Sequence, residues 1–314
     1  MASVTLTMDS ADIERLAQYY QADQVKPVPH SVFRAQRPGV TITAYHSGKV
    51  LFQGNAIESE VARWQSEKNV AGSTKASTLH QSANLPDNFA EWTIIGSDEV
   101  GNGSYFGALT VCAVYLDVSL RRQIATLGVK DSKLLNDSQI IELAAKLQQL
   151  VPYHLTVCSP SDYNRANQTR NANQIKVSLH NFTVQKLIAK LDLTQRQALQ
   201  GVLIDQFTSP RNYLRDVRQE AHPLTEGLYF AEKGESEHLA VACASIIARA
   251  CFLESLVTFG APYDVVLPSG AGANVDQFAA KLIQRHGLEA LEQTAKLHFK
   301  NTEKAKRLAK ITGK

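Results

Sequence analysis

WTIIGSDEVGNGSYFG, residues 92–107, is the stretch on which the interpretation of this 314-residue chain depends. An apolar run of β-forming residues is followed by two adjacent acids, Asp98 and Glu99, and then by glycines at 101, 103 and 107. Short apolar runs are typical of strands in parallel or mixed sheets, and residues at strand ends commonly carry function. Because glycine frees the backbone, the two acids need not keep strand alternation, and both could face one pocket.

The paired acids indicate a metal site. Two neighbouring carboxylates repel each other, and a divalent cation between them relieves that repulsion. The amides of the 101–103 turn could also approach a polyanion, because no side chain stands in the way. A solvated strand end before a turn is the simpler alternative, and this motif alone does not decide between the two.

Asp205 repeats the pattern, because it directly follows a second apolar run at 202–204. Strand ends in α/β sheets cluster at one edge, where ligands bind, so we expect Asp205 to lie near Asp98 and Glu99. Such carboxylates around two hard cations, about 4 Å apart, are the arrangement used for phosphodiester hydrolysis. A fourth carboxylate could come from one of three acids that precede the next helix: Glu232, Glu235 or Glu237.

The composition is that of an ordinary globular protein. Apolar residues make up 44%, no stretch approaches the roughly 20 apolar residues that span a bilayer, and the N-terminus does not resemble a signal peptide. The four cysteines form no CxxC pair, which favours reduced thiols in the cytoplasm over a disulfide or zinc framework. The net charge of +3 says little, but residues 296–314 are rich in lysine and could meet phosphates or form a solvated helix face.

Two domains are predicted. Residues 1–67 form a small α+β domain, in which strands at 31–35, 40–45 and 49–53 make an antiparallel sheet between helices at 9–21 and 59–67. Residues 68–88 are rich in Ser, Ala, Thr, Asn and Gln and are interpreted as a linker. Residues 89–314 are expected to form an α/β domain with a mixed sheet flanked by helices. Its strands are predicted at 93–97, 110–116, 153–158, 202–204 and 228–231, and its helices around 140–147, at 173–191 and 238–256, and after 274 and 288.

Residues 97–103 (SDEVGNG) and 105–107 (YFG) resemble the signature of bacterial ribonuclease HIII. Residues 43–49 (TAYHSGK) with 53–54 are similar to the N-terminal domain of that family, which itself is similar to TATA-box-binding protein. The resemblance covers nearly the whole chain outside the linker. Further matching segments are 130–133 (KDSK), 163–164 (YN), 179–181 (LHN), 204–207 (IDQF), 240–249 (AVACASIIAR), 267–271 (LPSGA) and 296–302 (KLHFKNT).

The resemblance implies an endonuclease that cuts the RNA strand of RNA–DNA hybrids. Its fold would be ribonuclease H-like at 89–314, preceded by a TATA-binding-protein-like substrate-binding domain at 1–67. The products would carry 3′-hydroxyl and 5′-phosphate ends. In the family, the fourth acid is usually a glutamate that follows a Lys-Ala pair. In this chain Glu235 follows Lys233 and Gly234, so Gly234 replaces the usual alanine, and Glu237 stands where the family has an apolar residue. The family's catalytic acids, which would bind two Mg²⁺ or Mn²⁺ ions, fall on Asp98, Glu99, Asp205 and Glu235.

Substrate-binding roles also follow from the resemblance. The backbone of Gly101, Asn102 and Gly103 would contact ribose 2′-hydroxyls, which distinguish RNA from DNA. Ser132 and Lys133 would hold phosphates, although the residues alone favour a solvated loop with a helix cap. On the N-terminal sheet, Tyr45 and Lys49 could contact a duplex.

Two alternatives stay open at this point. A non-catalytic nucleic-acid-binding protein of the TATA-binding type would account for the N-terminal sheet and the basic C-terminus. A ribonuclease HII-like enzyme, which cuts at a single embedded ribonucleotide, would be a closer relative. For the enzyme we expect a cytoplasmic monomer whose partner is a nucleic acid and not a membrane.

Overall fold

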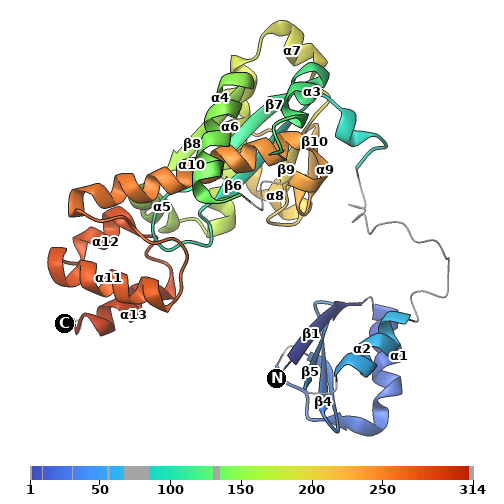
Figure 1. Ribbon diagram of the computed structural model, residues 1–314. Coiled ribbons are helices and arrows are strands. Elements are labelled where there is room, and N and C mark those ends of the chain that lie inside the picture. The colour runs from blue at the N-terminus through green and yellow to red at the C-terminus, as the bar shows by residue number, and fades with distance from the viewer. Residues whose placement is uncertain are drawn as a thin grey trace. The chain divides into compact units, whose positions relative to one another are not determined.

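The computed structural model describes residues 2–8, 10–29, 31–54, 57–66, 85–129 and 135–310. The chain divides into two compact units, Met1–His80 and Gln81–Lys314 (Figure 1). Each unit is described by itself. Residues 68–84 of the predicted linker lie outside the described residues, and Leu85 already packs against the core of the second unit.

The N-terminal unit contains an antiparallel sheet in the order β1-β5-β4-β3-β2. An α+β domain with an antiparallel sheet was predicted here. Helices α1 and α2 cover one face of this sheet (Figure 1). The sequence predicted the three central strands and both helices, and it missed the strands at the two edges. The elements are β1 (Ala2–Thr7), α1 (Ser10–Tyr19), β2 (Gln24–Val25), β3 (Ser31–Arg37), β4 (Val40–Tyr45), β5 (Lys49–Gly54) and α2 (Ile57–Ser66).

Strand alternation gives this sheet one buried face. Ile42, Ala44, Val50 and Phe52 are fully buried against the helices. Phe52 is therefore a core residue and not a surface contact. The residues between them point to the opposite face, so alternation places Tyr45 and Lys49 there; Lys49 is exposed and Tyr45 is half-buried.

The second unit contains a mixed five-stranded sheet in the order β10-β9-β6-β7-β8, which confirms the predicted fold class. Strands β6 (Ile94–Val100), β7 (Leu109–Leu116) and β8 (Tyr153–Cys158) form an antiparallel meander. Strands β9 (Gly201–Asp205) and β10 (Leu228–Ala231) run parallel to β6 and to each other. The interior strand β7, between β6 and β8, is buried along its whole length, which explains its nearly continuous apolar sequence.

Helices cover both faces of this sheet (Figure 1). On one face, α10 (Leu239–Gly260) packs with α4 (Asp137–Leu150); on the other lie α6 (Ala172–Lys190) and α8 (Pro210–Val217). A Cβ at Gly96 would stand 2.4 Å from the Val241 nitrogen, so glycine at this position lets α10 lie directly on β6. The remaining helices are α3 (Val118–Ala125), α5 (Pro160–Asn167), α7 (Leu193–Ala198), α9 (Gly234–Glu237), α11 (Ala273–His286), α12 (Glu289–Thr294) and α13 (Lys300–Leu308).

Helix α10 corrects one expectation from the sequence. By length and composition, Leu239–Tyr263 could cross a membrane, so the expectation that no stretch approaches this limit was wrong. In the fold, most of this segment is buried, and α10 packs on β6, β7 and α4. It is the core helix of the second unit, as the alanine-rich sequence at 238–256 predicted.

The four cysteines are free, as expected. Cys112 on β7 and Cys243 on α10 belong to one hydrophobic cluster between the sheet and this helix. Burial raises the pKa of both thiols, that of Cys243 to about 12. Cys251, farther along α10, is half-buried, and burial raises its pKa to about 11.

Candidate active site

Four carboxylates from three elements line a single pocket of about 310 Å³. Asp98 and Glu99 come from β6, Asp205 is the last residue of β9, and Glu235 lies in α9. Strands β6 and β9 pair in parallel as far as Ser97 and Ile204, so their next residues, Asp98 and Asp205, leave the paired region side by side. The structure thus brings the four predicted acids together. The other lining residues are Ile140, Ser245, Ile246 and Arg249.

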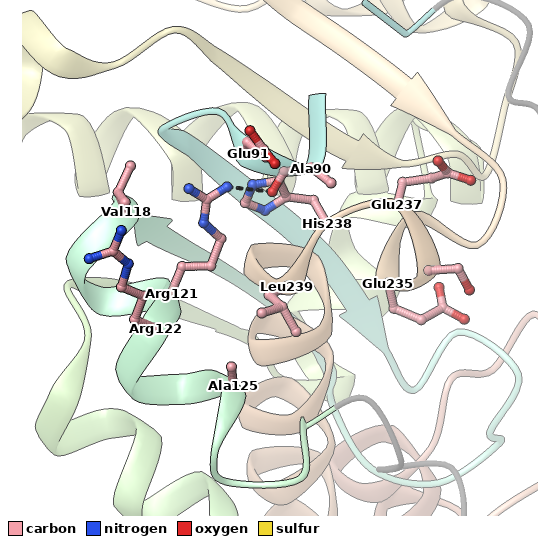
Figure 2. A pocket seen from close by; sticks show the side chains of 11 residues that line it. Ala90, Glu91, Val118, Arg121, Arg122, Ala125, Glu235, Glu237, His238 and Leu239 are labelled. Atoms are coloured by element: carbon pink, nitrogen blue, oxygen red, sulfur yellow. Dashed lines mark hydrogen bonds between the residues drawn. The ribbon is translucent and has the colours of Figure 1, made fainter. Parts of the chain in front are cut away.

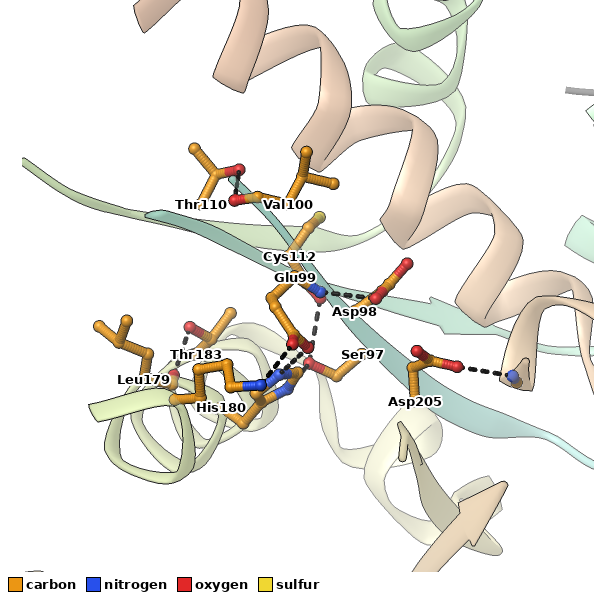
Figure 3. A network of polar contacts seen from close by, with 12 residues as sticks. Ser97, Asp98, Glu99, Val100, Thr110, Cys112, Leu179, His180, Thr183 and Asp205 are labelled. Carbon is orange, nitrogen blue, oxygen red and sulfur yellow. Dashed lines mark hydrogen bonds and ion pairs between the residues drawn. The ribbon is translucent and has the colours of Figure 1, made fainter. Parts of the chain in front are cut away.

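The two adjacent acids keep the alternation of the strand, which the sequence had left open. Strand β6 stays paired with β7 through both, Asp98 opposite Cys112 and Glu99 opposite Val111. Glu99 therefore points toward α6, and Asp98 points toward α10 (Figure 3). Both still reach the pocket because β9 ends here, which leaves that edge of β6 open.

Asp98 is nearly buried, at 8% exposure. Burial raises its pKa well above the ordinary value, and the charges of Asp205 and Glu99 raise it further. A hydrogen bond from Ser245 and the Glu99 amide, 2.7 Å from Oδ1, oppose this effect. The surroundings of Asp98 consequently disfavour its negative charge.

Glu99 has the opposite environment. Lys176 Nζ donates to its Oε1 at 3.2 Å. His180 Nε2 lies 3.0 Å from its Oε2 (Figure 3). Burial opposes the charge of Glu99, but the hydrogen bonds and charges of His180 and Lys176 lower its pKa overall. Both partners lie on α6, four residues apart, and Phe207 packs against both, with the Lys176 nitrogen 4.0 Å from its ring centroid. The sequence placed His180 in a family motif without a role and missed Lys176.

Asp205 is held by the turn that carries Glu235. Its Oδ1 accepts a hydrogen bond from the Gly234 amide at 2.7 Å. Burial raises the pKa of Asp205, and the charges of Glu235 and Glu99 add to this. Of the three candidates for the fourth acid, Glu235 lines this pocket, whereas Glu232 is exposed and lines none of the three pockets described for this unit.

Glu237 lines a neighbouring pocket of about 540 Å³, which Glu235 also borders. Figure 2 shows these two glutamates on one wall and Arg121 and Arg122 of α3 on the other. Arg121 donates to the Ala90 carbonyl at 2.5 Å. His238 lies between the walls, and burial lowers its pKa to about 4, so this histidine is neutral at neutral pH.

The donor set of the carboxylate pocket fits hard divalent cations. Carboxylate oxygens are the ligands that Mg²⁺ and Mn²⁺ prefer, and cations would relieve the repulsion that raises the pKa of Asp98 and Asp205. Among the described residues, no three such side chains are arranged as ligands of one ion. Of the two acids on β6, Glu99 is held by Lys176 and His180.

The glycine turn follows β6 directly. Gly101 has φ 99°, and a Cβ there would stand 2.2 Å from the Ala108 carbonyl oxygen, so only glycine fits. Asn102 and Gly103 are exposed at the turn. Two hydrogen bonds hold the chain after the turn. Lys296 Nζ donates to the Gly107 carbonyl at 2.6 Å, and the Tyr105 amide donates to the Gly270 carbonyl at 2.9 Å.

Four further side chains were predicted to contact the substrate. Ser132 and Lys133 lie outside the described residues. Tyr45 and Lys49 belong to the N-terminal unit.

Two family models match the chain. "Ribonuclease HII" matches residues 95–302, which include all four acids of the pocket. "Domain of unknown function (DUF3378)" matches residues 3–77.

Curated relatives match over nearly the full length. The chain is 47% identical over 290 residues to "Ribonuclease HIII" of Enterococcus faecalis (strain ATCC 700802 / V583), covering 92% of this chain and 93% of the relative. It is 44% identical over 312 residues to "Ribonuclease HIII" of Bacillus mycoides (strain KBAB4), covering 98% and 99%.

Solved structures share the fold. "Bst-RNase HIII in complex with Mn2+" is 38% identical, with a TM-score of 0.70, over 99% of this chain and 100% of that one. Aquifex aeolicus RNase H3 is 22% identical, with a TM-score of 0.53, over 94% of this chain and 99% of that one, and supports the fold alone.

Proposed function

The chain belongs to the ribonuclease HIII family and is a ribonuclease H endonuclease, and we propose that it hydrolyses the RNA strand of RNA–DNA hybrids with two divalent cations. The observation that supports this most directly is the pocket lined by Asp98, Glu99, Asp205 and Glu235. Family membership argues against the non-catalytic alternative.

The four acids would hold Mg²⁺ or Mn²⁺. When bound, the cations would supply an activated water for attack on phosphorus and would stabilise the leaving oxygen, giving 3′-hydroxyl and 5′-phosphate ends. The structure of Bst-RNase HIII in complex with Mn²⁺ supports a divalent cation as the cofactor.

The chain's own residues would prepare this site. Lys176 and His180 keep Glu99 ionised before metal binds, which their effect on its pKa supports. The backbone of Gly101, Asn102 and Gly103 would contact ribose 2′-hydroxyls beside the pocket. Ser132 and Lys133 would hold phosphates.

The N-terminal unit would supply affinity for the hybrid. We propose a substrate-binding domain at 1–67, a linker at 68–88 and a catalytic domain at 89–314. Tyr45 and Lys49 share the sheet face opposite the helices, where a duplex could reach them. Much of this affinity would be electrostatic and would fall with salt.

Asp98→Asn tests the proposal. We expect wild type to cut a labelled hybrid in Mg²⁺ or Mn²⁺ and to spare single-stranded RNA and double-stranded DNA. The variant should lose at least about 100-fold in kcat, because it removes a charged ligand. Glu232→Gln, at an exposed acid outside the pocket, is the matched control. Equal cleavage by Asp98→Asn and wild type would overturn the assignment.

Cleavage at single embedded ribonucleotides is a second candidate, because the family model that matches 95–302 is described as ribonuclease HII. Duplexes with one ribonucleotide and with four consecutive ribonucleotides separate the two activities. We expect efficient cleavage only of the second duplex. Equal rates on both would favour the ribonuclease HII-like activity.

A further inference from the structure

The carboxylate pocket is lined by one positively charged side chain, which has no role in the proposed metal site. Arg249 of α10 lines the pocket together with the four acids. Its Nη2 donates to Asp137 Oδ1 at 2.8 Å, and Asp137 is the first residue of α4. Asp137 does not line this pocket but borders a separate groove between α4 and α10.

The backbone of Arg249 is fixed relative to the acids. It lies four residues after Ser245, so the two side chains share one face of α10. Ser245 hydrogen-bonds Asp98, and the helix lies directly on β6 at Gly96. Helix α10 therefore holds the backbone of Arg249 beside the pocket, while the long side chain lets the guanidinium change its partner.

The ion pair with Asp137 is easily exchanged. The side chains are 36% and 62% exposed, and pairs this accessible to water contribute little to stability. A phosphate oxygen offers arginine a bidentate, charge-assisted partner, which a planar guanidinium binds particularly well. A phosphate that enters the pocket would thus compete successfully with Asp137.

The charge of the pocket shows why such a residue is needed. The described lining residues carry four carboxylates and one cation, Arg249. Two divalent cations would neutralise the carboxylates and leave the negative charge of the entering phosphate uncompensated. Arg249 has the right sign and position to compensate it.

We propose that Arg249 is a phosphate-binding residue of this site: it leaves Asp137 when substrate binds and pairs with a non-bridging oxygen of an RNA backbone phosphate at the pocket. The inference rests on the proposed function, because it takes the ligand to be a nucleic-acid strand. It adds a recognition contact on α10, supplied by neither the four acids nor the glycine turn.

The test measures binding without cleavage. A labelled RNA–DNA hybrid is titrated with the full chain at several salt concentrations and a fixed concentration of Ca²⁺, which can occupy carboxylate sites, and a gel checks that the hybrid stays uncut. Arg249→Met should weaken binding about 10-fold or more and lower the slope of log K against log salt by about 1, as expected for one lost phosphate contact. Arg249→Lys should have the salt slope of wild type, because it keeps the positive charge. It should bind the hybrid more weakly than wild type, because lysine cannot bind a phosphate in bidentate fashion. Arg285→Met, at an exposed arginine of α11, is the control for a general loss of charge.

Asp137→Asn separates phosphate binding from a structural ion pair. We expect this variant to keep the wild-type salt slope and hybrid affinity, because the phosphate replaces Asp137 in the complex. If it instead loses affinity as Arg249→Met does, and both variants melt at a lower temperature, the pair only joins α4 to α10 and the proposal is wrong. An unchanged slope for Arg249→Met also overturns it.

Failure of this inference is distinguishable from failure of the proposed function. If the wild type cuts hybrids but Arg249→Met binds them normally, only the role of Arg249 is lost. If the wild type neither binds nor cuts hybrids, the proposed substrate is wrong.

Discussion

Asp98 and Glu99 are neighbours in the chain, but their surroundings shift their pKa values in opposite directions. Strand alternation is the cause, because it sends Asp98 toward α10 and Glu99 toward the basic side chains of α6. The sequence identified the acids by type and position. It could not pair Glu99 with Lys176, because that contact joins residues 77 apart and depends on how α6 packs on the sheet.

Lys176→Met tests the buried ion pair. Lys176 and Glu99 are 4% and 9% exposed, so removing the cation leaves a buried carboxylate with less compensation. We expect the free energy of unfolding to fall by about 3 kcal/mol, measured by denaturant titration without metal. Lys306→Met, which breaks an exposed pair with Glu303, should cost less than about 0.5 kcal/mol. Adding Glu99→Gln to Lys176→Met should recover part of the loss; no recovery would mean that the effect is packing and not charge.

Lys296 predicts a pH dependence of stability. Burial lowers its pKa to about 7, below the ordinary value of 10.5. Between these two values the unfolded chain binds a proton that the folded chain does not, so this group makes stability rise with pH, by about 1.4 kcal/mol per unit. The cost of burying this amine is therefore greatest at and below pH 7 and disappears as the pH rises above 10.5. Denaturant titrations at several pH values should show this rise in wild type and a flatter dependence in Lys296→Met; parallel curves would contradict the assignment.

At the scale of elements, the sequence predicted what apolar periodicity encodes. The five strands of the second unit lie where the apolar runs lie, since strands buried on both faces are rich in apolar residues. Strands β1 and β2 were missed because they are edge strands, and β2 is only two exposed residues long. The position of α10 on β6 was equally hidden, because it depends on the missing side chain of Gly96.

Gly96→Ala is expected to disturb this contact. The added Cβ would stand 2.4 Å from the Val241 nitrogen, so α10 or β6 must move. We expect a loss of about 1–3 kcal/mol in unfolding free energy. Because α10 also carries Ser245 and Arg249, cleavage should fall as well. Gly103→Ala is the matched control for stability, since a Cβ there meets nothing within 4 Å. Equal stability of both variants would show that the helix adjusts without cost.

At the scale of the whole molecule, the two units have separate cores. One hydrophobic cluster belongs to the N-terminal unit, and the clusters of the second unit contain no residue from it. The four acids all come from the second unit. The sequence predicted the division from composition, since polar residues without periodicity separate two patterned regions, but it contains no local signal for the orientation of the units.

A chain reduced to 81–314 should therefore fold and keep its chemistry. We expect metal-dependent cleavage with kcat near that of the full chain and KM raised about 10-fold or more, because a second binding module is lost. The salt dependence of kcat/KM should also weaken. Circular dichroism confirms folding of the truncated chain. A large fall in kcat with unchanged KM would assign the N-terminal unit a role in catalysis instead of affinity.

The buried thiols between β7 and α10 have a practical consequence. Cys112 and Cys243 are shielded and hard to ionise while the helix lies on the sheet, so an alkylating reagent can reach them only when that layer opens. Cys251, farther along the same helix, is half-buried and offers an internal reference. The alkylation rate of Cys112 and Cys243 in the native chain therefore measures how often α10, which bears Ser245 and Arg249, separates from the sheet that bears the acids.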